Sequence, residues 1–264
     1  MLKRFGIFPN SYYTYKRNGG SAYQKRRVHI EETIIRLYHK YHGILGYRQL
    51  QPFLKDEGVA LSKLTVHKYM KSLGLKAIVR KKKPTYEKGE ENRVSPNIVN
   101  REFTAAARNR VWCTDFTYLH LTDGTMRYNC TILDLYSREV VASRCSRKID
   151  ARLAIDTLGE ALGRTGGTRG ILLHSDQGSQ YTSTEFREYC KEKGVLQSMS
   201  RAGCPYDNAP MERFFNTLKT ELIYQKYYQT ETALYQDILS FSYGWYNNVR
   251  PHTYNGGLPP AKVL

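Results

Sequence analysis

The chain has 264 residues, of which 41% are hydrophobic, so it is long enough for one large or two modest domains with real cores. Its formal net charge is +17, and the first 100 residues hold 21 Lys and Arg against 7 Asp and Glu, whereas the rest hold 20 against 17. A basic first third joined to a nearly neutral remainder predicts an arm that binds a polyanion, with nucleic acid as the leading partner. An anionic membrane surface fits less well, because the basic part lacks a strongly apolar helix face.

The cysteines and the N-terminus narrow the class of protein further. The five cysteines are scattered without a CxxC pair, which argues against a zinc knuckle or a redox motif and suits a reducing cytosol. The N-terminus has no apolar signal core, and no apolar run reaches the ~18 residues of a membrane span. We therefore expect a cytoplasmic protein that does not cross a membrane.

Three helices are predicted in the basic arm. The first covers residues 28–41, with Ile30, Ile34, Leu37 and Tyr41 on one face. The second is a short stripe of Leu50, Phe53 and Leu54, with Pro52 near its start. The third covers about residues 63–73, with Ser62 as N-cap and Gly74 as C-cap.

The last two of these helices are typical of a helix-turn-helix, because a short turn separates them and basic and hydroxyl residues open the second one. The side chains predicted to face DNA are Lys63, Thr65, His67 and Lys68. The alternative is a small helical bundle whose exposed face is basic. The charge asymmetry along the chain favours DNA binding independently of the pattern.

Residues 80–100 are predicted to be a linker, because Pro, Gly and charged residues dominate their first part. Lys81, Lys82 and Lys83 would add affinity for phosphate that does not depend on base sequence, or would only solvate a tether. The predicted organisation is a DNA-binding arm over residues 1–79, the basic linker over 80–100, and a catalytic core with a C-terminal helical extension over 101–264.

The core region is predicted to be an α/β domain. VWCTDFTYLHL, MRYNCTILDLY and REVVASRCSR are β-type runs separated by turn-like TDG and Ser137-Arg138, which indicates an antiparallel meander. A helix over about 150–163, a strand (ILLHS), a helix, a strand (VLQSMS) and a long helix from about Asn208 follow. This order predicts a mixed five-stranded sheet flanked by helices.

Three carboxylates lie in three different contexts of this core. Asp115 is in the middle of a strand, Asp176 directly follows a strand, and Glu212 is in the last helix, with 35 residues between the latter two. Each alone has a plain structural explanation. Together they suggest one site, because Mg²⁺ prefers oxygen ligands and two such ions can activate both oxygens in phosphoryl transfer.

Several neighbours of the carboxylates have structural or supporting explanations. His174 is predicted either to orient Asp176 by a hydrogen bond or to be a satisfied histidine at a strand end. Asp134 is interpreted as structural, and Asp207 and Asn208 are expected to cap the helix of Glu212. Trp112 and the aromatic residues of the tail (Phe241, Tyr243, Trp245 and Tyr246) are expected in the core.

The motifs TDFTYL, HSDQGSQYTS and PYDNAPMERFFNTLKTEL, in this order and spacing, resemble those of the DDE transposases of bacterial insertion sequences. The resemblance is to the group often called the IS-three family, which shares the retroviral-integrase core. It extends to the arm (GYRQL and LSKLTVHKYMKSLGLKA) and to YNNVRPHTYNGGLPPAKV near the C-terminus. Arg213 departs from the pattern, since the family often has Ser there.

The resemblance implies a ribonuclease-H-like fold and a function. Asp115, Asp176 and Glu212 match the catalytic, metal-binding carboxylates, and Lys219 matches a basic residue that contacts the phosphate of a donor end. The implied cofactor is Mg²⁺, as two ions for which Mn²⁺ can substitute. The implied reaction is cleavage and strand transfer of double-stranded DNA, at the terminal inverted repeats of an element and into a target.

The resemblance also implies a setting, namely a homo-oligomer on DNA in the bacterial nucleoid. The chain resembles the second-frame part of a transposase, so a first-frame protein is an implied partner. Two alternatives stay open at this point. One is a DNA-binding regulator of transposition without activity of its own, and the other is a stand-alone ribonuclease-H-like nuclease.

Overall fold

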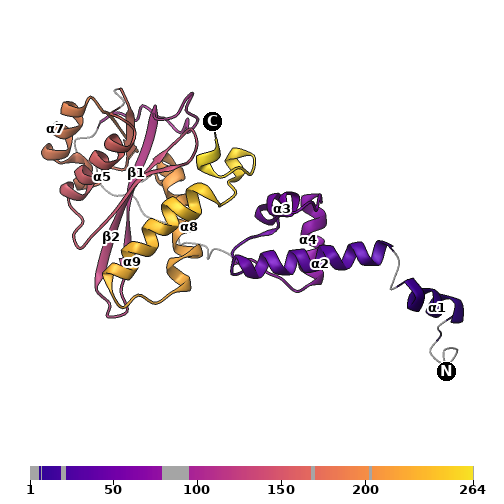
Figure 1. Ribbon diagram of the computed structural model, residues 1–264. Helices are drawn as coiled ribbons and strands as arrows, with labels where there is room; N and C mark the ends of the chain where they lie inside the picture. The colour runs from indigo at the N-terminus through magenta and orange to yellow at the C-terminus, as the bar shows by residue number, and fades with distance from the viewer. Residues whose placement is uncertain are drawn as a thin grey trace. The chain divides into compact units, whose positions relative to one another are not determined.

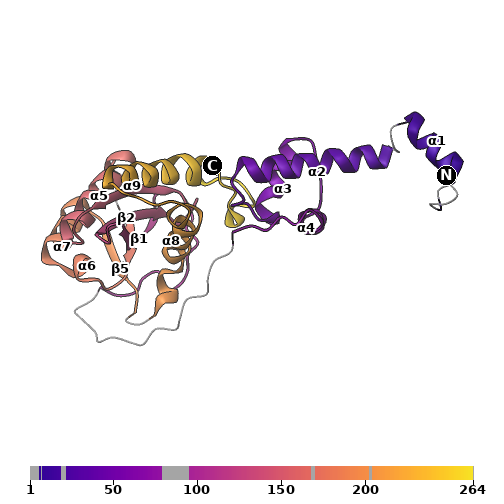
Figure 2. The ribbon, with the colours of Figure 1, turned by 90° about the horizontal axis from the view of Figure 1, so that it is seen from below.

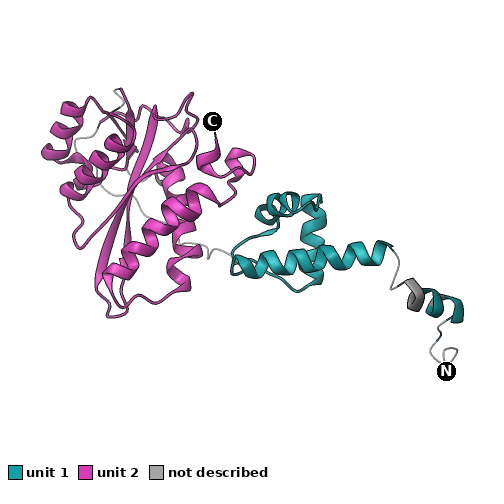
Figure 3. Cartoon of the chain, viewed as in Figure 1, with its two compact units in different colours: residues 1–78 teal, residues 79–264 magenta. Residues whose placement is uncertain are grey.

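The computed structural model describes residues 6, 8–18, 22–78, 95–167, 170–201 and 204–263. The chain forms two compact units, residues 1–78 and residues 79–264 (Figure 3). The predicted phosphate-binding residues Lys81, Lys82 and Lys83 lie outside the described residues. Within the described ranges, no helix is both long and apolar enough to span a bilayer.

The first unit is entirely helical. It contains α1 (Pro9–Asn18), α2 (Ala22–Lys40), α3 (Tyr47–Asp56) and α4 (Lys63–Ser72), as Figure 1 shows. Helices α2, α3 and α4 pack together through buried apolar residues: Ile30, Ile34, Leu37, Leu50, Leu54, Val66 and Met70. The predicted start of α4 is confirmed, because the Ser62 hydroxyl accepts a hydrogen bond from the backbone N–H of Thr65. Gly74 follows the helix with φ of 69°, as its predicted role requires.

Two details of the first unit differ from the prediction. Helix α2 begins at Ala22 rather than at residue 28, because its first turns are exposed and have no apolar periodicity to reveal them. Pro52 lies in the interior of α3 rather than near its start. The helix tolerates it because the missing N–H removes a single intrahelical hydrogen bond from a short element.

The second unit is built on a five-stranded sheet in the order β3-β2-β1-β4-β5. The strands are β1 (Val111–His120), β2 (Met126–Asp134), β3 (Val140–Ser146), β4 (Leu172–Ser175) and β5 (Leu196–Met199). Strands β1, β2 and β3 form the predicted antiparallel meander, while β4 pairs in parallel with both β1 and β5. The predicted mixed sheet is thus confirmed.

Helices cover both faces of this sheet (Figures 1 and 2). One face carries α5 (Ala151–Arg164), α6 (Ser179–Thr182) and α7 (Thr184–Lys193), and the other carries α8 (Ala209–Glu221) and α9 (Glu231–Leu239). Neighbouring residues of β1 pack on opposite faces of the sheet. Trp112 lies in the hydrophobic cluster beneath α5, and Cys113 lies in the cluster beneath α8. Irregular helical turns complete the unit: Pro205–Asn208, Ile223–Gln225, Ser240–Tyr246, Thr253–Asn255 and Pro260–Lys262.

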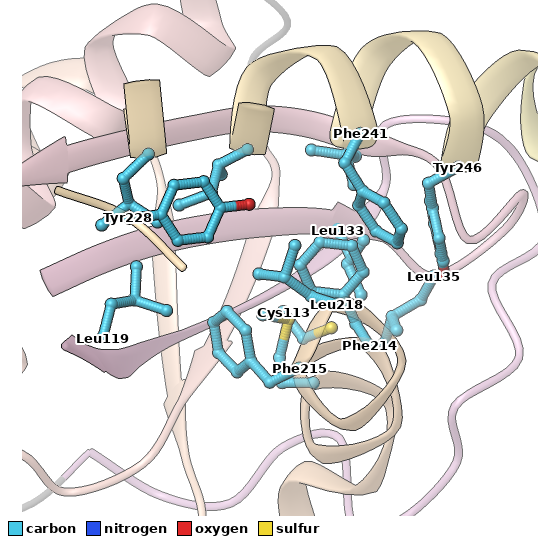
Figure 4. Close-up of a cluster of buried hydrophobic side chains, with 14 of the residues drawn as sticks. Cys113, Leu119, Leu133, Leu135, Phe214, Phe215, Leu218, Tyr228, Phe241 and Tyr246 are labelled. Carbon is cyan, nitrogen blue, oxygen red and sulfur yellow. The ribbon is translucent and has the colours of Figure 1, made fainter. Parts of the chain in front are cut away.

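The cluster beneath α8 holds the last part of the chain against the sheet. Figure 4 shows Phe214, Phe215 and Leu218 of α8 in one cluster with strand residues such as Cys113 and Leu133 and with the tail residues Phe241 and Tyr246. The expectation that Trp112 and the tail aromatics belong to the core is confirmed. Trp112, Phe241 and Tyr246 are buried. Tyr243 and Trp245 are partly buried against the cluster beneath α8.

The end of the predicted linker is part of the second unit. The Ser198 hydroxyl oxygen of β5 accepts hydrogen bonds from the backbone N–H groups of Ile98 and Val99, at 2.9 and 3.3 Å. Val99 is buried. Residues 96–100 therefore pack along the β5 edge of the sheet, and the prediction that the linker extends to residue 100 is wrong at this end.

Candidate active site

Asp115 and Asp176 lie on neighbouring parallel strands. The register of β1 and β4 pairs Val111 with Leu172 and Cys113 with His174. Continued by two steps, the same register sets Asp115 beside Asp176, which directly follows the last residue of β4. Adjacent strands are ~4.8 Å apart, so a register continued in this way brings the backbones of the two aspartates close together.

The local backbone supports Asp176 in this place. Its Oδ1 accepts a hydrogen bond of 2.9 Å from the N–H of Gly178. A Cβ at position 178 would lie 3.0 Å from that oxygen, so glycine allows the close approach. Asp176 is an exposed residue, yet the protein atoms around its carboxyl group desolvate it and raise its pKa, while the Gly178 N–H opposes the rise.

A buried tyrosine, Tyr181, lies within electrostatic range of both carboxylates. The Tyr181 hydroxyl is 3.0 Å from that of Thr114. Burial raises the pKa of Tyr181 well above its usual range, and electrostatic interaction with Cys130, Asp115 and Asp176 adds to this effect. Both aspartates thus act electrostatically on one buried group, which agrees with their side-by-side placement.

The helix that carries Glu212 is tied to β1 at the neighbour of Asp115. The Asn208 side-chain amide donates a 3.2 Å hydrogen bond to the carbonyl oxygen of Thr114. Glu212 is four residues further on, in the first turn of α8. Asn208 stands at the N-cap position of α8, as expected, but its side chain makes no capping hydrogen bond, and its amide N–H donates to β1.

Asp207 is not a helix cap. Its carboxylate, which has no exposed surface, accepts hydrogen bonds from Asn97, Arg101 and Arg201. Burial is the largest single influence on the pKa of Asp207, and it raises that pKa. The hydrogen bonds from the two arginines outweigh this and hold the pKa at about 2.

His174 connects this segment to the sheet. Its Nε2 donates to the carbonyl oxygen of Asp207 at 2.8 Å, and its Nδ1 accepts from the Ser198 hydroxyl at 2.9 Å. This tautomer follows because a carbonyl oxygen can only accept and because burial lowers the pKa of His174, which favours the neutral ring. Both nitrogens are occupied, so the hypothesis that His174 orients Asp176 directly is wrong, and the satisfied strand-end histidine is correct.

The donor set suits a hard divalent cation, since all three carboxylates offer only oxygen. In the part of the chain that the structure describes, however, no three His, Cys, Asp or Glu side chains are gathered closely enough to hold an ion. The large cavity between α5 and α7, about 680 Å³, contains none of the three carboxylates. The metal site itself therefore stays a prediction.

The residues predicted to contact DNA are distributed over both units. Lys63, His67 and Lys68 are exposed on α4, whereas the Thr65 hydroxyl is shared with Ser62 at 2.9 Å. Lys219 lies on α8 two turns after Glu212. Asp134 is structural, as interpreted, because its carboxylate accepts hydrogen bonds from Asn109 and Ser137.

Replacing Asp176 with Asn is expected to raise the melting temperature of the metal-free protein at neutral pH. The folded-state pKa of Asp176 is raised, so its negative charge costs stability above the unfolded pKa of ~3.9, and the cost disappears below that pH. Thermal unfolding in EDTA at pH 7 tests this. Asp123→Asn is the control for which the opposite change is expected. Hydrogen bonds from Thr125 lower the pKa of Asp123, so loss of this carboxylate should lower the melting temperature. A lower melting temperature for Asp176→Asn would contradict the prediction.

Asp207 is expected to stabilise the fold in a pH-dependent way. Its folded-state pKa of about 2 lies below the unfolded value, so the stabilisation is present above pH ~4 and is lost as the pH falls toward 2. The carboxylate's charge contributes ~2 kcal/mol at neutral pH by this linkage. The difference in urea unfolding between the native chain and Asp207→Asn should shrink between pH 5 and pH 3. A difference independent of pH would show that the charge is not the cause.

Comparison with known proteins decides the family. An integrase core domain model matches residues 105–205, a second integrase core domain model matches residues 193–260, and an HTH-like domain model matches residues 25–83. The transposase for insertion sequence element IS904 of Lactococcus lactis subsp. lactis (strain IL1403) is 34% identical over 234 residues, which cover 88% of this chain and 92% of that protein. The chain belongs to the family of insertion-sequence transposases.

A second relative extends the match over nearly the whole chain. InsF, the transposase for insertion sequence IS3A of Escherichia coli (strain K12), is 31% identical to this chain over 265 residues. The match covers 99% of this chain and 92% of InsF. Because the match includes both the arm and the core, the regulator and stand-alone nuclease alternatives are not favoured. The family is that of DDE-type polynucleotidyl transferases, as the motifs predicted.

A solved structure supports the fold independently. The intasome of simian T-cell lymphotropic virus, in complex with the PP2A regulatory subunit B56 gamma, matches with a TM-score of 0.50 and 18% identity. The match covers 87% of this transposase and 73% of the intasome chain. At this identity the likeness shows the shared integrase fold.

Proposed function

We propose that this transposase cuts phosphodiester bonds at the ends of a bacterial insertion sequence and joins the freed 3′ ends to other DNA, at a Mg²⁺-dependent centre formed by Asp115, Asp176 and Glu212. The observation that supports this most is the parallel register of β1 and β4, which would bring Asp115 and Asp176 side by side if continued two steps beyond Cys113 and His174. The tether from Asn208 to Thr114 supports Glu212 as the third member.

The three carboxylates would hold the metal, as two Mg²⁺ ions for which Mn²⁺ can substitute. Bound ions of this kind supply an activated water and neutralise charge on the reacting phosphate. The protein's own part is positioning, as is general in phosphoryl transfer. Asp115 and Asp176 are held by the sheet, and Glu212 by α8. Lys219, two turns after Glu212, would neutralise a phosphate of the donor end.

The proposed partner is double-stranded DNA, as terminal inverted repeats and as target. Lys63, His67 and Lys68 on α4, with Thr65 at its first turn, would enter the major groove as a recognition helix does. Lys81, Lys82 and Lys83 in the linker from residue 80 would add phosphate affinity that falls with salt. Residues 1–79 would thus be the DNA-binding arm, and the core after the linker the catalytic part.

The proposed setting follows from the reaction. Both ends of an element must be brought together, so we expect a homo-oligomer on DNA, at the nucleoid of a bacterial cytoplasm. A first-frame protein is a further proposed partner.

The test uses labelled duplexes taken from the DNA that flanks the coding region, with the full-length transposase. Cleaved strands and joined products should form with Mg²⁺ or Mn²⁺ and disappear in EDTA. The assay is repeated with the product of any overlapping upstream frame. Binding without cleavage under both conditions would favour the regulator, and cleavage of RNA–DNA hybrids without strand transfer would favour the nuclease.

A further inference from the structure

A buried carboxylate holds two arginines from distant segments of the catalytic unit. Arg101 donates through Nε to Oδ1 of Asp207 at 2.6 Å, and Arg201 donates through Nε to Oδ2 at 3.1 Å. The amide of Asn97 and the backbone N–H of Arg201 also donate to Oδ2. Because both guanidinium groups bind one carboxylate, they lie close to each other.

Each of these arginines binds Asp207 in a way that leaves the terminal N–H groups of its guanidinium available to a ligand. Within the described residues each contacts Asp207 through Nε alone, and their side chains are 48% and 55% exposed. Arg250 is different, because it binds Glu221 through both Nε and Nη2 and is only 12% exposed. The terminal N–H groups of Arg101 and Arg201 are therefore in reach of a ligand in solvent, while their Nε atoms fix the two groups in place.

The charge of the cluster favours an anion. One carboxylate faces two guanidinium groups, so one positive charge remains uncompensated. Two guanidinium groups at this spacing repel each other, and the structure keeps both exposed rather than giving each its own carboxylate. Arginine forks match the oxygens of a phosphate, which accepts two parallel N–H bonds.

The cluster stands next to the candidate active site. The N–H of Ser200 donates to the carbonyl oxygen of Ser175 at 2.9 Å. Asp176 follows Ser175, and Arg201 follows Ser200, so the two side chains leave adjacent ends of β4 and β5. Asp207 itself directly precedes Asn208, the residue that ties α8 to β1.

We propose that Arg101 and Arg201 form a clamp for a backbone phosphate of DNA, close to the phosphate that is cut, and that Asp207 is the positioning residue that holds the clamp. This inference rests on the proposed function, since it assigns a second contact to the DNA strand that enters the same site. The contact is to phosphate and independent of base sequence.

The test is the salt dependence of DNA binding by the full-length transposase. Binding of a fluorescently labelled element-end duplex is measured by anisotropy in EDTA, between 50 and 200 mM salt, so that catalysis plays no part. The double variant Arg101→Gln/Arg201→Gln is expected to bind about tenfold more weakly, with a slope of log K against log salt that is shallower by about 1 to 2. Arg152→Ala is the control, because Arg152 is 71% exposed and paired with Asp156 on α5, so both affinity and slope should stay unchanged.

A second variant separates the clamp from a purely structural role. In Arg201→Lys the positive charge is kept and the ammonium can still pair with Asp207, but the bidentate guanidinium is lost, so affinity should fall while the salt slope stays nearly unchanged. Melting temperatures of all variants are measured beside binding. An unchanged slope and affinity in both arginine variants, with normal binding by the native chain, would overturn the clamp and leave the proposed function standing. Failure of the native chain to bind any duplex would overturn both.

Discussion

Replacing Asp115 with Asn, or Glu212 with Gln, is expected to lower strand cleavage and joining by at least about a thousandfold, because catalytic groups that act as a unit fail together. Each amide keeps the size of the native side chain but removes the negative charge that would hold a divalent ion. The Asn at position 115 can still accept the hydrogen bond from the N–H of Phe116. DNA binding should remain nearly intact, since the helix-turn-helix unit is unchanged. Product formation from labelled ends and duplex affinity are measured side by side.

The matched control for these variants is Asp156→Asn. Asp156 is a partly exposed carboxylate of α5, paired with Arg152 and packed in the layer opposite α8. Its replacement should leave cleavage within about twofold, as expected for surface changes away from special features. Asp115→Asn or Glu212→Gln proteins that still cut element ends at the native rate would remove these residues from the mechanism.

Replacing Phe214 with Ala is expected to destabilise the catalytic unit by about 3–5 kcal/mol, the usual range for truncating a buried Phe. Phe214 is 1% exposed, and its ring meets that of Tyr246 edge-on, with 4.9 Å between centroids (Figure 4). The lost packing is that between α8 and the C-terminal part of the chain. Since α8 also carries Glu212 and Lys219, cleavage should become sensitive to temperature.

Urea unfolding followed by tryptophan fluorescence measures this change, because both tryptophans, Trp112 and Trp245, belong to the catalytic unit. Tyr227→Ala is the control, since Tyr227 is 93% exposed and its truncation should change stability by less than about 0.5 kcal/mol. An effect of Phe214→Ala below about 1 kcal/mol would mean that α8 is not packed on this cluster as described.

Local sequence patterns were sufficient to predict the elements of which one face is buried in the core. The β-type run around Asp115 predicted strand β1, and the Ser62 and Gly74 signals predicted the ends of α4. Pattern was insufficient where a segment is exposed or irregular. The first turns of α2 have no apolar face to reveal them, and the residues before Arg101 resemble a linker although Val99 is buried.

The sequence by itself determined the order of the elements, the family and the identity of the three candidate carboxylates, because periodicity and motif spacing are local properties. Tertiary structure alone decided which groups meet. Arg101 and Asp207 are 106 residues apart, and Asn208 and Thr114 are 94 apart, so no local signal connects them. The parallel register of β1 and β4 sets Asp115 beside Asp176, and the path of the chain into α8 turns Asp207 toward arginines rather than toward the helix end. Such partners are selected by the packing of the whole sheet, since a buried carboxylate or amide must find its hydrogen bonds wherever the fold supplies them.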